Sequence, residues 1–348
     1  MTPERLNELL SQFAKHRIAV LGDFFLDKYL DIDPQLDEPS LETGRVAFQV
    51  VGSQKSPGAA GTVVNNLTAL GAGQLHALGL IGDDGEGYDL TRAFAAQGCQ
   101  TEGLIRSPEV VTPTYLKPRN RAIPGLAGEH SRYDTKNRAK TPSHLISQVA
   151  AALDHLLPSL DALVIMDQVE LTGCGVVTSE LRDILAEQAL RYRKVIFWVD
   201  SRRHIRHFRN MITKPNQFEA VGRPNPLPGD EITTSDLRTV IPKMRAETGA
   251  PVFVSFGRKG MFVTDPELQL IPGVHVTGTI DPTGAGDSAT AGAVLALCSG
   301  ASYAEAALIA NLVASVTVQQ LGTTGTATPD QVRDALQLWR AQQDNGRF

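Results

Sequence analysis

The stretch "GTIDPTGAGDSATAGAVLAL", residues 278–297, decides the fold expected of this chain. A Gly-Ala-Gly turn leads directly into a run of small and apolar residues, which is typical of a long buried helix. Gly284 and Gly286 permit tight backbone geometry where this helix begins. Their amides, with that of Ala285, can point at one anion, and the positive helix end favours the same anion. The stretch therefore predicts an anion hole at a helix N-terminus.

Asp287 lies in the first turn of the same predicted helix, beside the expected anion hole. This pairing suits phosphoryl transfer, because the hole stabilises developing negative charge and the carboxylate accepts a hydroxyl proton. The alternative is structural, since an aspartate behind a glycine turn is also a common helix N-cap. We favour the catalytic interpretation.

Strand and helix patterns alternate along most of the chain. Apolar runs predict strands at residues 17–21, 75–80, 162–166, 194–199 and 252–256. Helices are expected at about 60–71, 86–97, 142–157, 176–191, 234–247, 285–299, 303–319 and 329–343. This order is typical of a mainly parallel central sheet with helices on both faces, a three-layer α/β/α sandwich.

Two segments, 31–55 and 109–133, interrupt this alternation. They contain alternating apolar and polar residues and several prolines, but no helix pattern. We expect them to form a small β-sheet lid over the carboxyl ends of the parallel strands. The whole chain, residues 1–348, is expected to be a single domain carrying this lid.

The composition is that of an ordinary soluble protein: 42% of its 348 residues are hydrophobic and 20% are charged. A net charge of −5 gives no reason to expect nucleic acid or an anionic membrane as partner. No apolar run reaches the ~18 residues of a membrane span. Cys99, Cys174 and Cys298 are far apart and form no CxxC pair, which argues against a cysteine zinc site and indicates a reducing compartment. We expect a cytoplasmic protein.

A second stretch, "RIAVLGDFFLDKYLDID" (residues 17–33), places Asp23 and Asp27 at the end of a predicted strand. Burying a carboxylate is costly unless something satisfies it. The pair therefore either caps local backbone or binds a polar ligand, and the residues alone leave both interpretations open.

Five stretches, in order along the chain, resemble the ribokinase-like (PfkB) sugar kinases. They are "VLGDFFLDKY", "SPGAAGTVVNNLTALGAGQLHALGLIGDDGEG", "TKPNQFEA", "VSFGRKGM" and "DPTGAGDS", and the resemblance covers about residues 15–340. Within the family the chain most resembles the heptose-7-phosphate kinases, including the kinase half of the bifunctional heptose kinase/adenylyltransferases. It ends where that half would end, so we expect no adenylyltransferase domain.

The resemblance implies an ATP-dependent, Mg²⁺-requiring carbohydrate kinase with a ribokinase-like fold. Asp287 then resembles the catalytic base, and Gly284, Ala285 and Gly286 the anion hole for the transferred phosphoryl group. Asn216 and Glu219 resemble the N-x-x-E pair, in which the glutamate acts on Mg²⁺ largely through water. Taken alone, these two residues would more simply be a helix cap and a first-turn acid. The nucleotide would lie along Ser255, Gly257, Gly260 and Asn311, and several relatives also use K⁺ near the anion hole.

The resemblance also implies a sugar site beneath the lid, formed by Asp23, Asp27, Gly58, Thr62, Lys117, Arg119 and Arg132. Asp23 is the firmer candidate, whereas Asp27 is open between a sugar contact and a structural hydrogen bond. The basic lid residues, as a set, favour a phosphorylated sugar; each one alone is more simply a solvated surface residue. The chain departs from the family pattern at Ala59, where a second glycine is usual, and at Thr62, where an asparagine is usual.

Three other functions compete with this one. A kinase of a neutral sugar or nucleoside shares the same residues. A catalytically silent sugar-binding regulator could use the same fold, and the departures at Ala59 and Thr62 keep it open. A dinucleotide-binding dehydrogenase is disfavoured because "GDFFLD" and not G-x-G-x-x-G follows the first strand. Exposed lid strands often pair with a neighbouring molecule, so a homodimer through the lid is expected.

Overall fold

The structure, a computed structural model, describes residues 1–123, 125–223, 225–322 and 324–344. Its centre is a six-stranded parallel sheet in the order β12-β11-β10-β1-β6-β7. The strands are β1 (Arg17–Gly22), β6 (Gln74–Gly82), β7 (Gln100–Ser107), β10 (Ala162–Asp167), β11 (Ile196–Ser201) and β12 (Ile212–Thr213). The mainly parallel sheet expected from the sequence is confirmed.

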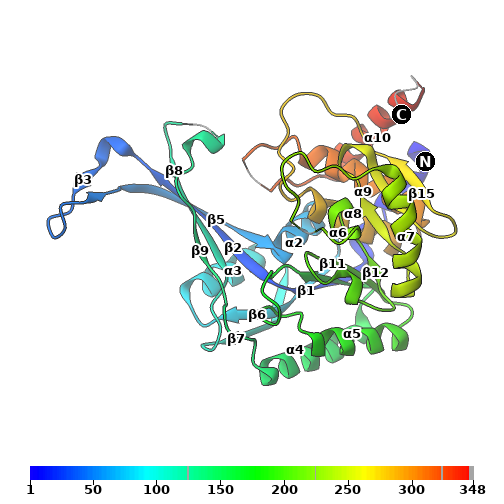
Figure 1. Ribbon diagram of the computed structural model, residues 1–348, viewed down its shortest axis with the longest axis horizontal. Coiled ribbons are helices and arrows are strands. Elements are labelled where there is room, and N and C mark those ends of the chain that lie inside the picture. Colours follow the sequence, from blue (N-terminus) through cyan, green and yellow to red (C-terminus); the bar gives the residue numbers. More distant parts are fainter. Residues whose placement is uncertain (124, 224, 323, 345–348) are drawn as a thin grey trace.

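Helices cover both faces of this sheet, because successive side chains of a strand point to opposite sides. In β1, Ile18 and Val20 belong to one hydrophobic core, and Ala19 and Leu21 belong to the other. The first core is closed by α1 (Pro3–Leu10), α2 (Ala60–Ala69), α3 (Gly85–Ala96), α8 (Ala285–Cys298), α9 (Tyr303–Thr317) and α10 (Pro329–Asp344). The second is closed by α4 (Ser143–Leu156), α5 (Ser179–Arg191) and α7 (Thr234–Thr248). Figure 1 shows α4 and α5 on the side of the sheet opposite α8 and α10.

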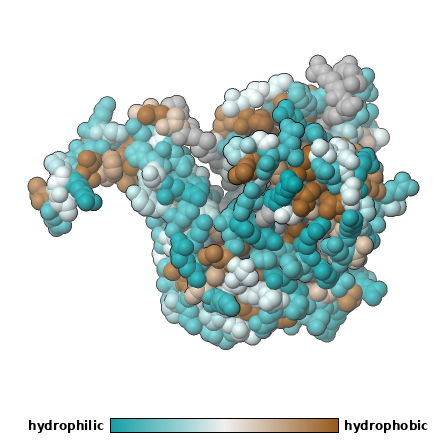
Figure 2. Space-filling model, viewed as in Figure 1, coloured by the Kyte–Doolittle hydropathy of each residue, from teal (hydrophilic) through white to brown (hydrophobic). Residues whose placement is uncertain are grey.

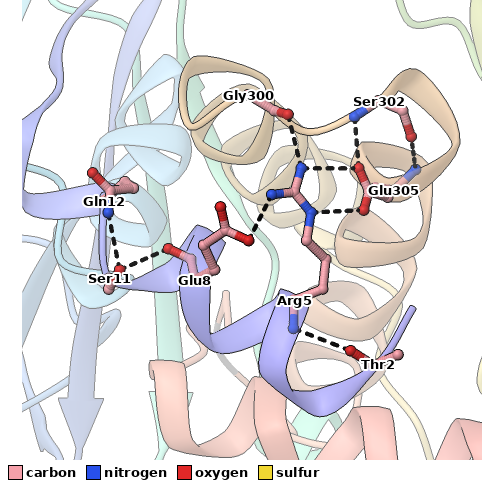
Figure 3. A network of polar contacts seen from close by, with 8 residues as sticks. All are labelled: Thr2, Arg5, Glu8, Ser11, Gln12, Gly300, Ser302 and Glu305. Atoms are coloured by element: carbon pink, nitrogen blue, oxygen red, sulfur yellow. Dashed lines mark hydrogen bonds and ion pairs between the residues drawn. The ribbon is translucent and has the colours of Figure 1, made fainter.

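Arg5 ties the first helix to the start of α9 in the C-terminal half of the chain (Figure 3). Arg5 donates from Nε to Glu305 Oε1 at 2.9 Å and from Nη2 to the Gly300 carbonyl at 2.9 Å. Glu305 also accepts from the Ser302 amide, and Ser302 Oγ accepts from the Glu305 amide, which completes a capping box at the start of α9. No helix among the described residues has the length and hydropathy to cross a bilayer.

A separate antiparallel sheet consists of β13 (Phe253–Ser255), β14 (Gly260–Val263) and β15 (Gln269–Pro272). The expected strand 252–256 therefore exists, but its strand partner is not in the central sheet. Only single parallel bridges, Thr213 to Val252 and Asn216 to Ser255, connect it toward β12 within the described residues. Its apolar run resembles that of a parallel strand, so the sequence could not distinguish the two.

The lid is a four-stranded mixed sheet in the order β5-β2-β8-β9, and it projects from the body of the molecule (Figure 1). Its strands are β2 (Phe24–Ile32), β5 (Val50–Ala59), β8 (Thr114–Asn120) and β9 (Tyr133–Thr135), with a hairpin of β3 (Glu38–Pro39) and β4 (Val46–Ala47) at the tip. The expected lid segments 31–55 and 109–133 hold much of it, residue 124 lying outside the described residues. The boundary at 31 is wrong, since the first lid strand begins at Phe24.

The lid begins so early because the chain leaves β1 without a linker. At Gly22 a Cβ would lie only 2.2 Å from the Met166 carbonyl oxygen, so only glycine allows β1 and β10 to approach this closely. The Asp23 amide then donates to that same oxygen at 3.1 Å. The polar and apolar residues of 24–32 are consequently those of a lid strand and not of a loop.

At the other lid junction, Ala59 ends β5 and caps α2 with φ 51° and ψ −119°. A residue with a side chain rarely adopts this conformation, which glycine reaches freely. Ala59 is the position where the resembled family usually has its second glycine. The backbone at Ala59 therefore has a conformation suited to glycine, and the Cβ of alanine makes that conformation strained.

Ala59→Gly is expected to raise the free energy of unfolding by about 1 kcal/mol, because it relieves that strain. Ala60→Gly, one residue on at the start of α2, is the matched control and should lower it by about 0.5–1 kcal/mol. Urea unfolding of both variants measures the difference. If Ala59→Gly were less stable than the unaltered protein, the interpretation that Ala59 is strained would be wrong.

Candidate active site

A cleft of about 750 Å³ opens where the N-terminus of α8 meets the carboxyl ends of β11 and β12. All residues predicted for catalysis and for the nucleotide line it: Asp287, Gly284, Ala285, Gly286, Asn216, Glu219, Ser255, Gly257, Gly260 and Asn311. Ligands commonly bind at this edge of an open parallel sheet. The fold thus brings together side chains that are far apart in sequence.

The turn before α8 leaves two of the three predicted anion-hole amides free. Gly284 adopts a left-handed conformation, with φ 76°, and caps the helix without a side chain. The Ala285 amide donates to the Pro282 carbonyl at 3.1 Å, so it is used within the turn. In the described parts of the chain no hydrogen bond occupies the amides of Gly284 and Gly286. The set of free amides is therefore smaller than predicted, because the Ala285 amide closes the turn.

Asp287 lies in the first turn of α8 and lines the cleft, but the helix N-cap is Gly284. The N-cap alternative for Asp287 is thereby excluded. Burial raises the pKa of the Asp287 carboxyl to about 7, with a further contribution from nearby Asp200, whereas Lys214 and Arg202 act to lower it. A carboxylate with a pKa near neutrality can accept a hydroxyl proton at ordinary pH.

Two charged residues of the cleft, Asp200 and Lys214, were missed by the sequence reasoning. Asp200 lies near the end of β11 and Lys214 follows β12, and both line the cleft. Their side chains are buried, with Lys214 Nζ 2.7 Å from Asp200 Oδ2. A charged residue directly after an apolar strand was the available signal, since such residues gather at the carboxyl edge of a parallel sheet.

Asn216 and Glu219 form a capping box around the short helix α6 (Gln217–Ala220). Asn216 Oδ1 accepts from the Phe218 and Glu219 amides, at 2.8 and 3.0 Å, and Glu219 Oε2 accepts from the Asn216 amide at 2.8 Å. The structural interpretation of the pair is therefore confirmed. Glu219 nevertheless lines the cleft, and burial beside Asp200 raises the pKa of its carboxyl.

The residues predicted to lie along the nucleotide shape the far wall of the cleft. Asn311 Nδ2 donates to the carbonyls of Ile271 and Pro272, at 3.0 and 3.2 Å, and so ties α9 to β15. At Gly260, with φ 108°, a Cβ would lie 2.1 Å from the Ile271 carbonyl oxygen. These contacts explain the residue types through packing, and the nucleotide contact remains a prediction.

On the sugar side, Asp23 is enclosed and does not line the cleft. Its carboxylate accepts from the amides of Gln168, Val169 and Val176, at 2.8, 3.2 and 2.8 Å. Burial raises the pKa of Asp23 to about 6, with a further contribution from Asp167. Asp23 was predicted to be the firmer sugar ligand, but the structure favours the other interpretation, because the backbone of the loop after β10 already satisfies its oxygens.

Asp27 and Gly58 are diagonal neighbours on β2 and β5, where the register pairs Asp27 with Ser56 and Gly58 with Phe25. A Cβ on Gly58 would lie close against Asp27 Oδ2, so the glycine leaves space for this carboxylate. Lys117 Nζ lies 2.8 Å from Asp27 Oδ1 and 3.2 Å from the Tyr29 hydroxyl. Thr62 is buried in α2, with Cγ2 3.3 Å from the position of a Cβ on Gly284. Of the predicted sugar residues, Thr62 therefore lies beside the turn before α8.

The predicted lid cations are not free. Arg119 Nε lies 2.6 Å from Asp31 Oδ1, and Arg132 Nε lies 2.7 Å from Asp134 Oδ1. Because β2 and β8 are adjacent parallel strands, Asp31 lies directly opposite Arg119. Lys117, Arg119 and Arg132 are each paired with a carboxylate, so the expected basic cluster of the lid is nearly neutral in this conformation.

One cation without an ion pair among the described residues, Arg138, lines a smaller cavity of about 170 Å³ at the base of the lid, called here the basic cavity. The cavity is lined by Phe25, Pro113, Tyr115, Lys136, Asn137, Arg138, Gln168, Val169, Glu170, Leu171 and Arg202. Of the other two cations there, Lys136 lies 3.5 Å from Asp134 and Arg202 lies 3.9 Å from Glu170. Gln168 and Arg202 also line the larger cleft, so the two spaces adjoin. Among the described residues no ion pair or hydrogen bond is found for Arg138. The lining residues come from separate segments of the chain and meet only in the folded protein.

Asp23→Ala is expected to lower the free energy of unfolding by about 3 kcal/mol, because it leaves three buried amides without an acceptor. If Asp23 only caps the backbone, the KM values for sugar and ATP should change by similar factors. Urea unfolding and steady-state kinetics of the same preparation check both. A selective rise in the sugar KM, with stability intact, would restore Asp23 as a sugar ligand.

Two kinds of known protein are similar to this chain. The curated relatives include the bifunctional protein HldE of a Nitratiruptor species, 29% identical over 325 residues, and that of Chromohalobacter salexigens, 30% identical over 327 residues. The alignments cover 92% and 90% of this chain but 65% and 62% of those proteins, so the chain spans less than two thirds of their length.

Solved structures with the same fold include phosphofructokinase-2 from Escherichia coli in complex with potassium, with a TM-score of 0.71 and 19% identity over 93% of this chain and 100% of that one. Arabidopsis thaliana ribokinase complexed with ribose and ATP has a TM-score of 0.64 and 17% identity over 92% and 98%. At these identities the likeness shows a shared, ribokinase-like fold. A model of the pfkB family of carbohydrate kinases matches residues 16–331. The chain therefore belongs to the pfkB family, phosphotransferases that act on a sugar hydroxyl.

Proposed function

We propose that the protein is an ATP-dependent carbohydrate kinase formed by one domain over residues 1–348, with Asp287 as its catalytic base. One observation carries this assignment. A carboxyl with a pKa of about 7 lies in a cleft beside the amides of Gly284 and Gly286, at the positive end of α8. This is the arrangement that phosphoryl transfer to a hydroxyl needs.

In the proposed reaction the sugar hydroxyl oxygen attacks the γ-phosphorus of ATP. A new O–P bond forms, the bond from this phosphorus to the bridging oxygen breaks, and its electron pair leaves with ADP. The hydroxyl proton passes to the Asp287 carboxylate. The amides of Gly284 and Gly286 stabilise the charge on the transferred group, and closure of the lid excludes the water that would otherwise accept it.

Glu219 supports the proposed requirement for Mg²⁺. Within the described residues no three His, Cys, Asp or Glu side chains converge to hold a metal ion directly. Mg²⁺ usually retains several waters and takes few carboxylates. The pKa of Glu219 is raised by burial and by Asp200, which marks excess negative charge that a cation would relieve. The ion would neutralise the ATP phosphates, with Glu219 in its outer shell. The potassium in one structural neighbour supports testing K⁺ as a further cofactor.

We propose a phosphorylated, heptose-like sugar as substrate. The HldE relatives support this choice, and so does the basic cavity, where Arg138 has no ion-pair partner among the described residues and Arg202 also lines the cleft. A neutral sugar or nucleoside is the second candidate, because Lys117, Arg119 and Arg132 already have acidic partners. A silent sugar-binding regulator is less well supported, since such a protein would not need a base in the cleft.

We further propose a homodimer formed through the lid. Figure 2 shows hydrophobic residues along the projecting lid. Exposed apolar side chains there include Leu36, Leu41, Val46, Phe48, Val50 and Val51. A second copy that paired lid edges would cover them. The three cysteines are unpaired, which supports a cytoplasmic location.

Asp287→Asn is expected to reduce phosphoryl transfer by at least about 10³-fold, because the amide cannot accept the hydroxyl proton. ATP binding should persist, since the free amides remain. A coupled ADP-release assay across sugars and sugar phosphates with Mg²⁺, with and without K⁺, measures transfer, and calorimetry measures binding. Near-normal turnover in this variant would refute the mechanism.

If the basic cavity binds a phosphate on the sugar, a phosphosugar should have a higher kcat/KM than its unphosphorylated parent. Arg138→Ala should then raise the phosphosugar KM about tenfold, because a charge-assisted hydrogen bond is lost, and leave the parent sugar unaffected. Arg193→Ala is the matched control, because Arg193 is exposed and lies just before β11, at the end of that strand away from the cavity. A preference for the unphosphorylated sugar would select the second candidate.

A further inference from the structure

Lys214 is a buried cation that has no part in the mechanism described so far. Its side chain is 3% exposed, and its ammonium group lies 2.7 Å from Asp200 Oδ2. A buried ion pair by itself contributes little to stability, because desolvating both charges costs about as much as their attraction returns. A structural role alone is therefore a weak reason for a lysine here.

The position of Lys214 relates it to the anion hole. Lys214 Nζ lies 3.4 Å from the place that a Cβ on Gly286 would occupy, so the absence of a side chain at Gly286 leaves the ammonium group next to the helix N-terminus. Both residues line the 750 Å³ cleft. The cation and one of the two free amides therefore border the same space.

Lys214 also has hydrogen-bonding capacity to spare. An ammonium group carries three donors, and the contact to Asp200 is the one partner found for it in the described parts of the chain. Its charge is secured by its surroundings: burial lowers the pKa of Lys214, but Asp200, Glu219 and Asp287 together raise it above its usual value. Lys214 is thus a fixed positive charge with donors available to an anion.

Building on the proposed kinase function, we propose that Lys214 is a catalytic residue whose ammonium group binds the transferred phosphoryl group together with the amides of Gly284 and Gly286. Asp200 is then a positioning residue that holds the ammonium in place. During transfer the phosphoryl oxygens carry negative charge between two oxygen atoms, and a preorganised cation stabilises that charge without moving a proton.

Removing Lys214 also leaves Asp200 buried and unpaired, so a single variant cannot separate the two effects. Lys214→Met is therefore compared with the double variant Asp200→Asn/Lys214→Met, which removes one charge of each sign. Lys243→Met, on the exposed surface of α7, is the control for loss of a lysine. Thermal unfolding of each variant verifies that it is folded.

Both Lys214 variants are expected to lose about 10²–10³-fold in kcat, as on removal of one oxyanion-hole donor, with little change in the sugar KM. Binding gives a second readout that needs no turnover. Calorimetry with Mg²⁺ should show that the variants bind ADP like the unaltered protein but lose most of its preference for ATP, because the ammonium contacts only the group that is transferred.

The pH profile separates direct contact from an indirect effect on the base. Asp287 faces Asp200, which raises its pKa, and Lys214 and Arg202, which lower it. Lys214→Met should therefore shift the acidic limb of kcat/KM to higher pH. In the double variant the two removed effects oppose each other, so the limb should return toward that of the unaltered protein while kcat stays low.

Recovery of kcat in the double variant would overturn the proposal, because Lys214 would then serve only to neutralise Asp200. An unchanged preference for ATP over ADP in Lys214→Met would overturn it as well. Failure of the unaltered protein to phosphorylate any sugar or sugar phosphate would instead contradict the kinase assignment, and the ATP and ADP affinities would still show whether Lys214 contacts the terminal phosphate.

Discussion

Parallel strands all end at the same edge of their sheet, and the chemistry of this molecule depends on that constraint. The order β12-β11-β10-β1 brings Asp200, Lys214 and the loop after β10 to one edge, and α8 points its N-terminus at the same place. Charges that would be costly to bury singly compensate one another there. The cleft consequently holds carboxylates, a lysine and free backbone amides side by side, so an anion bound there would be accompanied by a cation.

The carboxylates at this edge fall into two groups according to what satisfies them. Asp23 accepts three backbone amides and Glu219 closes a capping box with one oxygen, so both hold the local backbone in place. Asp287 has no such partner among the described residues, and its raised pKa reflects its burial. Carboxylates that accept backbone hydrogen bonds therefore support the local structure, whereas a carboxylate without such a partner is available to react.

Much of the fold could be predicted, because apolar runs and helical periodicity are local properties. Strands β1, β6, β10 and β11 and the long helices lie close to their predicted bounds. The GAGD turn stands at a helix N-terminus, as its small residues predicted. The hydrogen-bond partners of Asp23 could not be predicted, since these amides lie at least 145 residues away. Lys214 lies within the stretch "TKPNQFEA", but nothing in that stretch shows that the folded sheet places its side chain beside Asp200 and Gly286. The residues of the basic cavity likewise meet only in the folded chain.

Two of the connections between the lid and the body share hydrogen bonds and have no intervening linker. β2 continues directly from β1 at Asp23, and β5 enters α2 directly at Ala59, where the Ala60 amide donates to the Asp23 carbonyl at 3.1 Å. These direct connections prevent the lid sheet from moving independently of the body. If the lid closes as proposed, the backbone at Asp23 moves with it, and the Asp23 side chain accepts a hydrogen bond from Gln168, a residue shared by the cleft and the basic cavity. Movement of the lid would therefore be coupled to the lining of both spaces.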